Sequence, residues 1–330
     1  YVGKDIAYQF WKFGVLDRDF HYRLYSRQRS GHPLWSTSGS PAPNDPTPPP
    51  FGDAGAVYNV IDTRQAYLQQ LLKQALTTTN RPDEAKRSVH VSYEMVALSH
   101  TTAKILGYAA DADEGRPFVE VSGRKGLGVK ADDLLNRLTA AALTEVTKRH
   151  ANLPAAEADR IATAIAIAAV RYFMIKYSRG TLIVFDIDDA LSFEGESGPY
   201  IQYAVVRATN LLRKLRDKDG TDEAALVESL AGLPSDPLRD PDGTELWGLV
   251  LEAARLDEVA DQSIRALELS VLAKYTFRLA QMFNTFYHSS PVINEERRDV
   301  RLWRATAITY CRLQLTRALD LMGCEVPPRM

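Results

Sequence analysis

The chain has 330 residues, enough for about two domains, and its 45% hydrophobic and 25% charged residues are typical of a soluble globular protein rather than a disordered or fibrous one. The formal net charge of −2 excludes a strong overall attraction to polyanions, so any nucleic-acid surface must be a local basic patch. Cys311 and Cys324 fit no zinc spacing, and the six histidines include no pair three or four residues apart, so we expect a reduced, metal-free protein in the cytoplasm.

Residues 1–14 have the spacing of a helix, and Gly14 is a plausible C-terminal stop. Tyr1 and Asp5 lie one turn apart on one face of this helix. Such a pair can hold a guanidinium, because the carboxylate accepts two N–H bonds while the ring face attracts the cation. The alternative is a surface Asp beside a Tyr of the core. The chain starts at Tyr1 without an initiator Met or a signal-peptide pattern, which favours a fragment that begins within a helix.

A proline-rich stretch and a strand follow this helix. Residues 39–52 are polar and rich in proline, which predicts an exposed loop, with a proline-motif ligand as the alternative. Residues 57–61 are mostly β-branched and predict a strand that leads into an amphipathic helix. Ligands of doubly wound sheets bind at the carboxyl ends of strands, and Asp62, Arg64 and Gln65 fall at such an end.

A second strand and a glycine-rich segment come next. Residues 89–96 alternate like a strand, with His90 near its start, and a lone strand histidine is more often structural than functional. Residues 122–129 form a glycine-rich segment that contains Arg124 and Lys125. Close backbone approach and two cations suit a polyphosphate, because negative charge develops as pyrophosphate leaves. The segment does not match the phosphate-loop pattern in which Lys precedes Ser or Thr.

From Asp132 onward the pattern is helical. A second long helix is expected from Pro154 to about Lys176. The most apolar run, residues 161–175, is too short and too rich in alanine to span a bilayer, so we expect no membrane association. Residues 185–189 are acidic and suggest either a metal site or the cap of a helix N-terminus. The cap is favoured, because no second carboxylate motif accompanies the cluster.

Another helix is expected to start near Pro199, because the preceding residues are breakers and proline suits the first helical turn. Tyr200, Tyr203 and Arg207 follow at spacings of three and four, which places two rings and a guanidinium on one face. The alternative is an aromatic stripe of the core. The last helix carries a basic stripe, for which a solvated face and a phosphate-tracking face are the two interpretations, formed by Arg297, Arg301, Arg304 and Arg312.

Several of these segments, in the same order along the chain, resemble class I arginyl-tRNA synthetases. The first half contributes Tyr-x-x-x-Asp-Ile-Ala-Tyr at 1–8, Asp-x-Arg-Gln-x-Tyr at 62–67, His-x-x-Tyr-x-Met-Val at 90–96 and Ser-x-Arg-Lys-Gly at 122–126. The second half contributes Gly-Pro-Tyr-Ile-Gln-Tyr-Ala-x-x-Arg at 198–207, Phe-Asn-x-Phe-Tyr at 283–287 and a closing segment that ends in Pro-x-x-Met at 327–330. The resemblance covers nearly the whole chain.

The resemblance implies an α/β part followed by an all-helical part, predominantly helical overall. Residues 1–145 would be half of a class I Rossmann-type catalytic domain, and residues 146–330 an all-α anticodon-binding domain of the DALR type. The implied activity is arginine–tRNA ligation, in which ATP activates L-arginine and the arginyl group passes to the 3′ end of the cognate tRNA. The implied partners are ATP with its Mg²⁺, L-arginine and the tRNA for arginine, with no protein-bound metal, no membrane and no DNA.

The resemblance also assigns residues to these ligands. The arginine contacts would be Tyr1, Asp5 and Gln65. The ATP contacts would be His90, Met95, Val96, Ser122 and Lys125. Arg124 and Lys125 would act on the phosphates during catalysis, and the anticodon contacts would be Tyr200, Tyr203, Tyr287 and Met330.

One departure from the family pattern concerns catalysis. The first family signature, His-x-Gly-His, does not occur in these residues, and the first lysine of the second signature is not evident. We therefore expect the isolated chain to be inactive and an upstream segment to supply the first signature. The alternative is a non-catalytic tRNA-binding relative.

Overall fold

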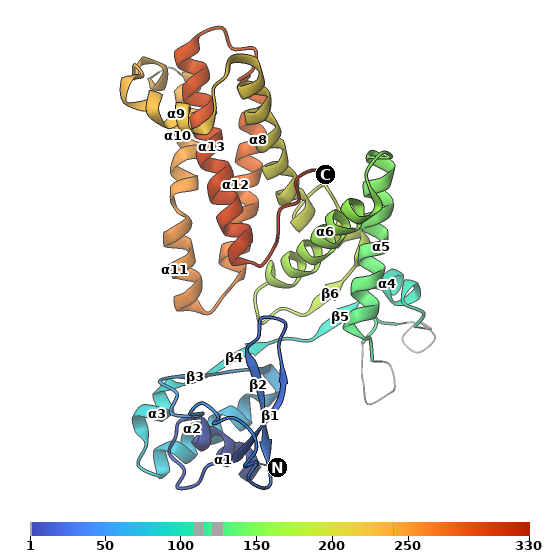
Figure 1. Cartoon of the computed structure of the whole chain (residues 1–330), viewed down its shortest axis with the longest axis vertical. Helices are drawn as coiled ribbons and strands as arrows, with labels where there is room; N and C mark the ends of the chain where they lie inside the picture. Colours follow the sequence, from blue (N-terminus) through green and yellow to red (C-terminus); the bar gives the residue numbers. More distant parts are fainter. Residues whose placement is uncertain (1, 109–114, 121–127, 240) are drawn as a thin grey trace. The chain divides into compact units, whose positions relative to one another are not determined.

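The computed structural model describes residues 2–108, 115–120, 128–239 and 241–330 (Figure 1). Two compact units, Tyr1–Glu94 and Met95–Met330, divide the chain. Within the described ranges the chain is mainly helical and has three two-stranded sheets, so the predicted α/β part followed by a helical part is confirmed. The domain boundary expected after residue 145 stays a prediction.

The first unit builds a small core around its first helix. In chain order its elements are α1 (Val2–Lys12), β1 (His21–Arg27), β2 (Pro33–Ser38), β3 (Val57–Asp62), a 3-10 turn (Thr63–Gln65), α2 (Ala66–Thr78), α3 (Pro82–Arg87) and β4 (Ser88–Tyr93). Strands β1 and β2 form an antiparallel hairpin, and β3 and β4 pair in parallel. Phe13, Val57 and Leu76 are buried together. The predicted stop of α1 is confirmed, because Gly14 has a φ of +67°.

Helix α1 is fixed against β3 by a polar cluster as well as by this core. The Gln9 amide donates to Ser88 Oγ at 2.9 Å, and the Asn59 amide donates to Gln69 Oε1 at 2.9 Å. Lys12 Nζ donates to Asn59 Oδ1 at 2.9 Å, and burial lowers the pKa of Lys12. Buried polar groups that hydrogen-bond one another fix a unique geometry. These hydrogen bonds therefore fix the orientation of α1 relative to β3 and β4.

Residues 39–52 form a loop without helix or strand, as predicted from their prolines. The loop packs against the β1–β2 hairpin through two contacts. Asp45 Oδ2 accepts from the Leu24 N–H at 2.6 Å, and the Phe51 ring packs on Tyr22 with the centroids 4.7 Å apart. One face of the hairpin is therefore covered by the loop.

The strand predicted at residues 89–96 is two strands in the structure. Strand β4 ends at Tyr93, and β5 (Val96–Leu98) pairs in parallel with β6 (Ile183–Phe185) in a separate sheet. The sequence pattern also missed β6, which lies in a region interpreted as helical throughout. Three residues are too few to display a period of two, so the pairing of β6 depends on a long-range partner that the local pattern does not show.

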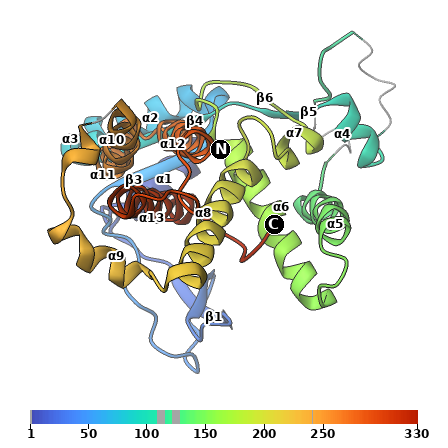
Figure 2. The same cartoon turned by 90° about the horizontal axis from the view of Figure 1, so that it is seen from above.

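The second unit is a set of packed helices. They are α4 (His100–Ile105), α5 (Ala131–Arg149), α6 (Ala155–Ile175), α7 (Ile187–Leu191), α8 (Gly198–Asp219), α9 (Glu223–Ser229), α10 (Pro241–Ala254), α11 (Leu256–Ala266), α12 (Ser270–Ser289) and α13 (Arg298–Leu321). Helices α8, α10, α12 and α13 lie side by side around the largest core of the unit (Figures 1 and 2). The long helices expected from Asp132, Pro154 and Pro199 are confirmed.

The acidic residues at 185–189 cap a helix, as the sequence favoured. Asp186 accepts from the N–H groups of Asp188 and Asp189 at the start of α7, and its second oxygen accepts from Ser99 at 2.5 Å. In the described ranges, no group of three or more His, Cys, Asp or Glu side chains is arranged to hold a metal ion. Among the same residues, none of the helices combines the length and the apolar character that a bilayer crossing requires.

The start of α8 is fixed by a backbone contact with α6. Ser197 caps the helix, because its Oγ accepts from the Tyr200 N–H at 3.2 Å while donating to the Ser192 carbonyl. Gly198 lies against the backbone of Ala168 in α6, where an added Cβ would overlap the carbonyl oxygen. Only glycine permits this approach, so the two helices cross at a set point.

The C-terminal segment is held by the same two helices. Gln202 of α8 is fully buried and its amide nitrogen donates to two carbonyls, that of Ala164 in α6 at 3.2 Å and that of Glu325 at 2.6 Å. Arg329 pairs with Glu157 of α6 at 3.4 Å. The position of the last residues therefore depends on how α6 and α8 cross.

Replacing Gly198 by alanine should destabilise the second unit. The new methyl must displace the Ala168 backbone, and such overpacking costs about 1–3 kcal/mol. Urea denaturation of Gly198→Ala measures this loss. Gly180→Ala is the matched control, because no atom lies within 4 Å of its added methyl; equal stability of the two variants would contradict the role assigned to the contact.

Candidate nucleic-acid interface

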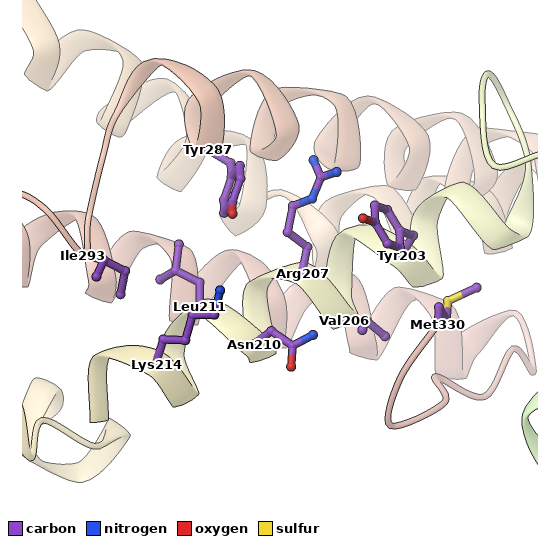
Figure 3. Close-up of a pocket in the computed structure, with 9 residues that line it drawn as sticks. All are labelled: Tyr203, Val206, Arg207, Asn210, Leu211, Lys214, Tyr287, Ile293 and Met330. Carbon is purple, nitrogen blue, oxygen red and sulfur yellow. The ribbon is translucent and has the colours of Figure 1, made fainter. Parts of the chain in front are cut away.

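A hollow of about 350 Å³ lies beside α8 in the second unit. This volume is within the range of pockets that hold small organic ligands. The residues that line the hollow come from α8, from the end of α12, from the turn after it and from the C-terminus (Figure 3): Tyr203, Val206, Arg207, Asn210, Leu211, Lys214, Tyr287, Ile293 and Met330.

A clamped arginine forms one wall of the hollow. The Arg207 guanidinium lies between two tyrosine rings, 4.7 Å from the centroid of Tyr203 and 5.1 Å from that of Tyr287 (Figure 3). Its Nη1 donates to Asn284 Oδ1 at 2.9 Å, and the Asn284 amide donates to Tyr200 Oη at 2.9 Å. Cation–π contacts and this hydrogen-bond chain hold the rings and the guanidinium in one arrangement.

The two tyrosines at the start of α8 have different surroundings. Tyr203 lines the hollow, and its ring meets the Phe193 ring edge-on, with the two centroids 6.5 Å apart. Tyr200 does not line the hollow; it packs on Phe277 at 5.4 Å and accepts a hydrogen bond from Asn284. The structure thus brings three of the four sequence-predicted anticodon residues, Tyr203, Tyr287 and Met330, to one hollow, and Tyr200 does not line it.

Sequence reasoning missed several residues that shape this site, among them the apolar Val206 and Leu211 of α8. Asn210 and Lys214 continue the face of Tyr203 and Arg207 along α8 at spacings of three and four, so extending the helical stripe would have found them. Lys214 is exposed and places a cation at the rim. Asn284 lies within the Phe-Asn-x-Phe-Tyr motif, but its bond to Arg207 depends on the packing of α12 on α8. Ile293 had no sequence signal.

Three of the four arginines in the basic stripe match neither interpretation drawn from the sequence, whereas the fourth, Arg297, is 56% exposed and fits a solvated face. Arg301, Arg304 and Arg312 have side chains only 17%, 8% and 17% exposed, so they do not form a solvated face. Each is neutralised by a carboxylate, at 3.4 Å, 2.8 Å and 2.8 Å respectively, from Asp219, Glu295 and Glu223. These guanidinium groups hold α13 to its neighbours, which removes them as phosphate contacts.

The candidate arginine-binding residues lie in the first unit. Asp5 is half-buried on α1, one face of which is fixed by the polar cluster around Asn59. Gln65 is exposed and ends the 3-10 turn after β3. Asp62 caps that turn, and the hydrogen bonds from the Arg64 side chain and backbone lower the pKa of Asp62 to about 2. Tyr1 lies outside the described residues.

The candidate ATP residues divide between the units. His90 is half-buried in β4, and its Nε2 hydrogen-bonds the Ile61 carbonyl of β3 at 3.0 Å, which ties the two strands together. Met95 accepts from the Ile183 N–H at 3.1 Å through its carbonyl, and Val96 begins β5. The three polar residues of the glycine-rich segment lie outside the described residues: Ser122, Arg124 and Lys125.

Comparison with known proteins gives matches over the whole chain. A family model described as the DALR anticodon binding domain matches residues 201–330. The chain is 34% identical to the arginine–tRNA ligase of Thermococcus kodakarensis and 32% identical to that of Deinococcus radiodurans, in both cases over 100% of this chain and over 47% and 50% of the relative. The solved arginyl-tRNA synthetase of Thermus thermophilus matches with a TM-score of 0.76 at 27% identity, over 100% of this chain and 49% of that one. The chain spans about half the length of the relatives it matches.

Removing Asn284 should loosen the clamp. Asn284→Ala deletes one bond to the Arg207 guanidinium and one to the Tyr200 hydroxyl, so we expect the free energy of unfolding to fall by about 1–2 kcal/mol in urea denaturation. Asn210→Ala is the control in the same hollow, since its one side-chain bond, to Arg213, is long at 3.4 Å. The control should change stability by less than about 0.5 kcal/mol. A loss at Asn284 no larger than at Asn210 would contradict the clamp.

Proposed function

The chain belongs to the arginyl-tRNA synthetase family, matching the C-terminal half of its members, and on that premise we propose that the protein is an arginine–tRNA ligase. In the proposed first step, the carboxylate of arginine attacks the α-phosphate of ATP, giving arginyl-adenylate and releasing pyrophosphate. In the second, a hydroxyl of the terminal ribose of the tRNA takes the arginyl group and AMP leaves. The observation that carries the proposal is the hollow beside α8, which lies inside the segment that matches the anticodon-binding domain.

The hollow suits an unpaired nucleobase. Single-stranded bases are recognised by stacking on aromatic rings, and Tyr203 and Tyr287, held in place by Arg207 between them, line the hollow with two such rings. The soft thioether of Met330 closes one end of the lining. Lys214 at the rim can neutralise a backbone phosphate, because it is exposed and cationic. We therefore propose that the anticodon of the tRNA for arginine binds here, with Tyr200 holding Asn284, which in turn binds Arg207.

The first unit supplies the arginine site in this proposal. Tyr1 and Asp5 hold the guanidinium of the substrate, and Gln65 makes a further contact from the end of β3. A carboxylate and a ring one helical turn apart match the charge and the flat face of a guanidinium. The fixed orientation of α1 against β3 supports this role, because selectivity needs a carboxylate held in place.

ATP is the second substrate, accompanied by Mg²⁺. His90 and the backbone of Met95 and Val96 are proposed to face the adenine, while Ser122, Arg124 and Lys125 approach the phosphates. Arg124 and Lys125 would stabilise the charge that develops as pyrophosphate departs. The ligase is favoured over a non-catalytic tRNA-binding relative, because relatives named as ligases match residues 1–145 as well as the anticodon-binding segment. The proposal places the reaction in the cytoplasm, with translation.

The anticodon site can be tested with the chain itself. Tyr203→Ala should weaken binding of an arginine anticodon stem-loop by about 1–3 kcal/mol, because a stacking ring is lost, and this loss should vary little with salt. Lys214→Ala should instead lower the slope of log affinity against log salt by about 1, because one phosphate contact is lost. Fluorescence anisotropy over a salt series measures both.

Tyr67→Ala is the control for the stacking result. Its ring is 72% exposed but lies on α2, in the other unit. Stem-loop affinity should be unchanged by this variant. If Tyr203→Ala also binds like the parent and the anticodon sequence makes no difference, the hollow is not the anticodon site.

The arginine site can be tested in the complete ligase. Asp5→Asn keeps the shape of the side chain but removes the charge that pairs with the substrate guanidinium, which should cost about 2–5 kcal/mol. The KM for arginine in pyrophosphate exchange should therefore rise steeply, with the KM for ATP nearly constant. Asp17→Asn, an exposed carboxylate beyond the end of α1, is the control. An unchanged arginine dependence in Asp5→Asn would remove this residue from the site.

A further inference from the structure

Asn59 of β3 is the centre of a polar cluster that reaches two helices of the first unit. Its amide nitrogen donates to Gln9 Oε1 of α1 at 3.3 Å and to Gln69 Oε1 of α2 at 2.9 Å. Its amide oxygen accepts from Lys12 Nζ of α1 at 2.9 Å. One side chain of the strand therefore binds both α1 and α2, which belong to the same unit (Figure 1).

Lys12 determines which way the Asn59 amide points. An ammonium group can only donate, so the oxygen of Asn59 faces Lys12 and its NH₂ group faces the two glutamines. The Lys12 ammonium also lies 4.7 Å from the centroid of the Tyr8 ring, one turn earlier on α1. Lys12 is thereby held by two partners, and the donor of Asn59 is directed to the glutamines in a single orientation.

The two glutamines lie one helical turn from the proposed arginine contacts. Gln9 follows Asp5 by four residues on α1, and Gln69 follows Gln65 by four residues at the start of α2, where Gln65 is in the N-cap position. Residues four apart lie on the same face of a helix. The positions of Asp5 and Gln65 therefore both depend on how their helices are bound to Asn59.

Burial makes these hydrogen bonds selective for one spacing. Gln9 and Gln69 are only 1% and 7% exposed, and the Gln9 amide nitrogen also donates to the buried Ser88 Oγ of β4. Apolar packing is non-directional, whereas a hydrogen bond restricts both distance and angle. A shift of either helix would leave a buried polar atom without its partner, which is costly. The cluster therefore favours one separation between the two helices.

We propose that Asn59 is a positioning residue for arginine recognition, which sets the separation between Asp5 and Gln65. The inference rests on the proposed function, because that proposal makes these two residues the arginine contacts. Since they come from different elements, their separation determines the length of the amino acid that the site accepts. Asn59 acts through Gln9 and Gln69 and makes no contact with the substrate.

The test measures pyrophosphate exchange by the complete ligase with L-arginine and with L-homoarginine, whose side chain is one methylene longer. Asn59→Leu keeps a similar side-chain volume but removes both the donor and the acceptor. The KM for arginine should rise about tenfold, because small displacements of contact residues are costly, while the KM for ATP stays constant. The ratio of kcat/KM for arginine to kcat/KM for homoarginine should fall about fivefold, because loosened contacts exclude the longer side chain less well.

A second pair of variants keeps the test decisive if Asn59→Leu folds poorly. Gln69→Met removes the oxygen that accepts from Asn59, whereas Gln69→Glu retains an oxygen acceptor. Gln69→Met should raise the KM for arginine and lower the selectivity ratio, and Gln69→Glu should restore both toward the parent values. A merely structural defect would lower the amount of active enzyme, and hence kcat, equally for both amino acids without changing the ratio.

Gln70→Met is the matched control, because Gln70 is the next residue of α2 and is exposed. It should leave both KM values and the selectivity ratio unchanged. The positioning role is overturned if Asn59→Leu and Gln69→Met lower kcat alone, or if the control changes the ratio as much as they do. Asp5→Asn separates the two proposals. If it raises the KM for arginine and the cluster variants do not, only the positioning role fails; an unchanged arginine dependence in Asp5→Asn overturns the arginine site and the positioning role with it.

Discussion

The crossing of α6 and α8 at Gly198 is the constraint on which the candidate anticodon site depends. Because no side chain separates Gly198 from the Ala168 backbone, α8 contacts α6 at a fixed point. This contact fixes the direction of α8 and therefore the positions of the side chains along it. One turn later Gln202 binds a carbonyl of α6 and a carbonyl of the C-terminal segment. The same junction therefore places the rings of α8 and the residue that closes the hollow, Met330, although they lie far apart in the sequence.

The second unit pairs some of its arginines with carboxylates inside the fold, whereas other cations of the chain are exposed to solvent. Arg301, Arg304 and Arg312 of α13 are neutralised inside the second unit, where a buried cation without a partner would be costly. Lys214 of α8 and the arginines of the β1–β2 hairpin, Arg23, Arg27 and Arg29, are exposed instead. The proposed RNA binding is compatible with the low net charge, because attraction can be concentrated at a few exposed cations while the remaining surface contributes little.

Local pattern was sufficient for the long helices of the fold. Caps and spacing identified α1, α6 and α8, and the cap formed by Asp186, because these signals are carried by neighbouring residues. The β1–β2 hairpin and strand β6 were not predicted. Strand β6 has only three residues, and its pairing partner β5 lies far away in the sequence. The roles of the site residues were harder to predict from the sequence. Tyr200 and Tyr203 have the same helical spacing pattern, and only the packing of α8 on α12 shows that Tyr203 lines the hollow while Tyr200 packs on Phe277. Family resemblance pointed to the tyrosines, and it gave no hint that the arginines of α13 are internally paired.

The clamp around Arg207 has a consequence for the thermodynamics of recognition. Its guanidinium is held on three sides, by Tyr203, Tyr287 and Asn284, before any ligand arrives. Ordering long side chains on binding normally costs conformational entropy, and here little of that ordering remains to be done. In the proposed anticodon complex, the entropy lost on association then belongs mainly to the nucleic acid. Affinity should accordingly track the stiffness of the loop, so that an RNA whose base is already turned out of the stack binds more tightly than one that must unstack it first.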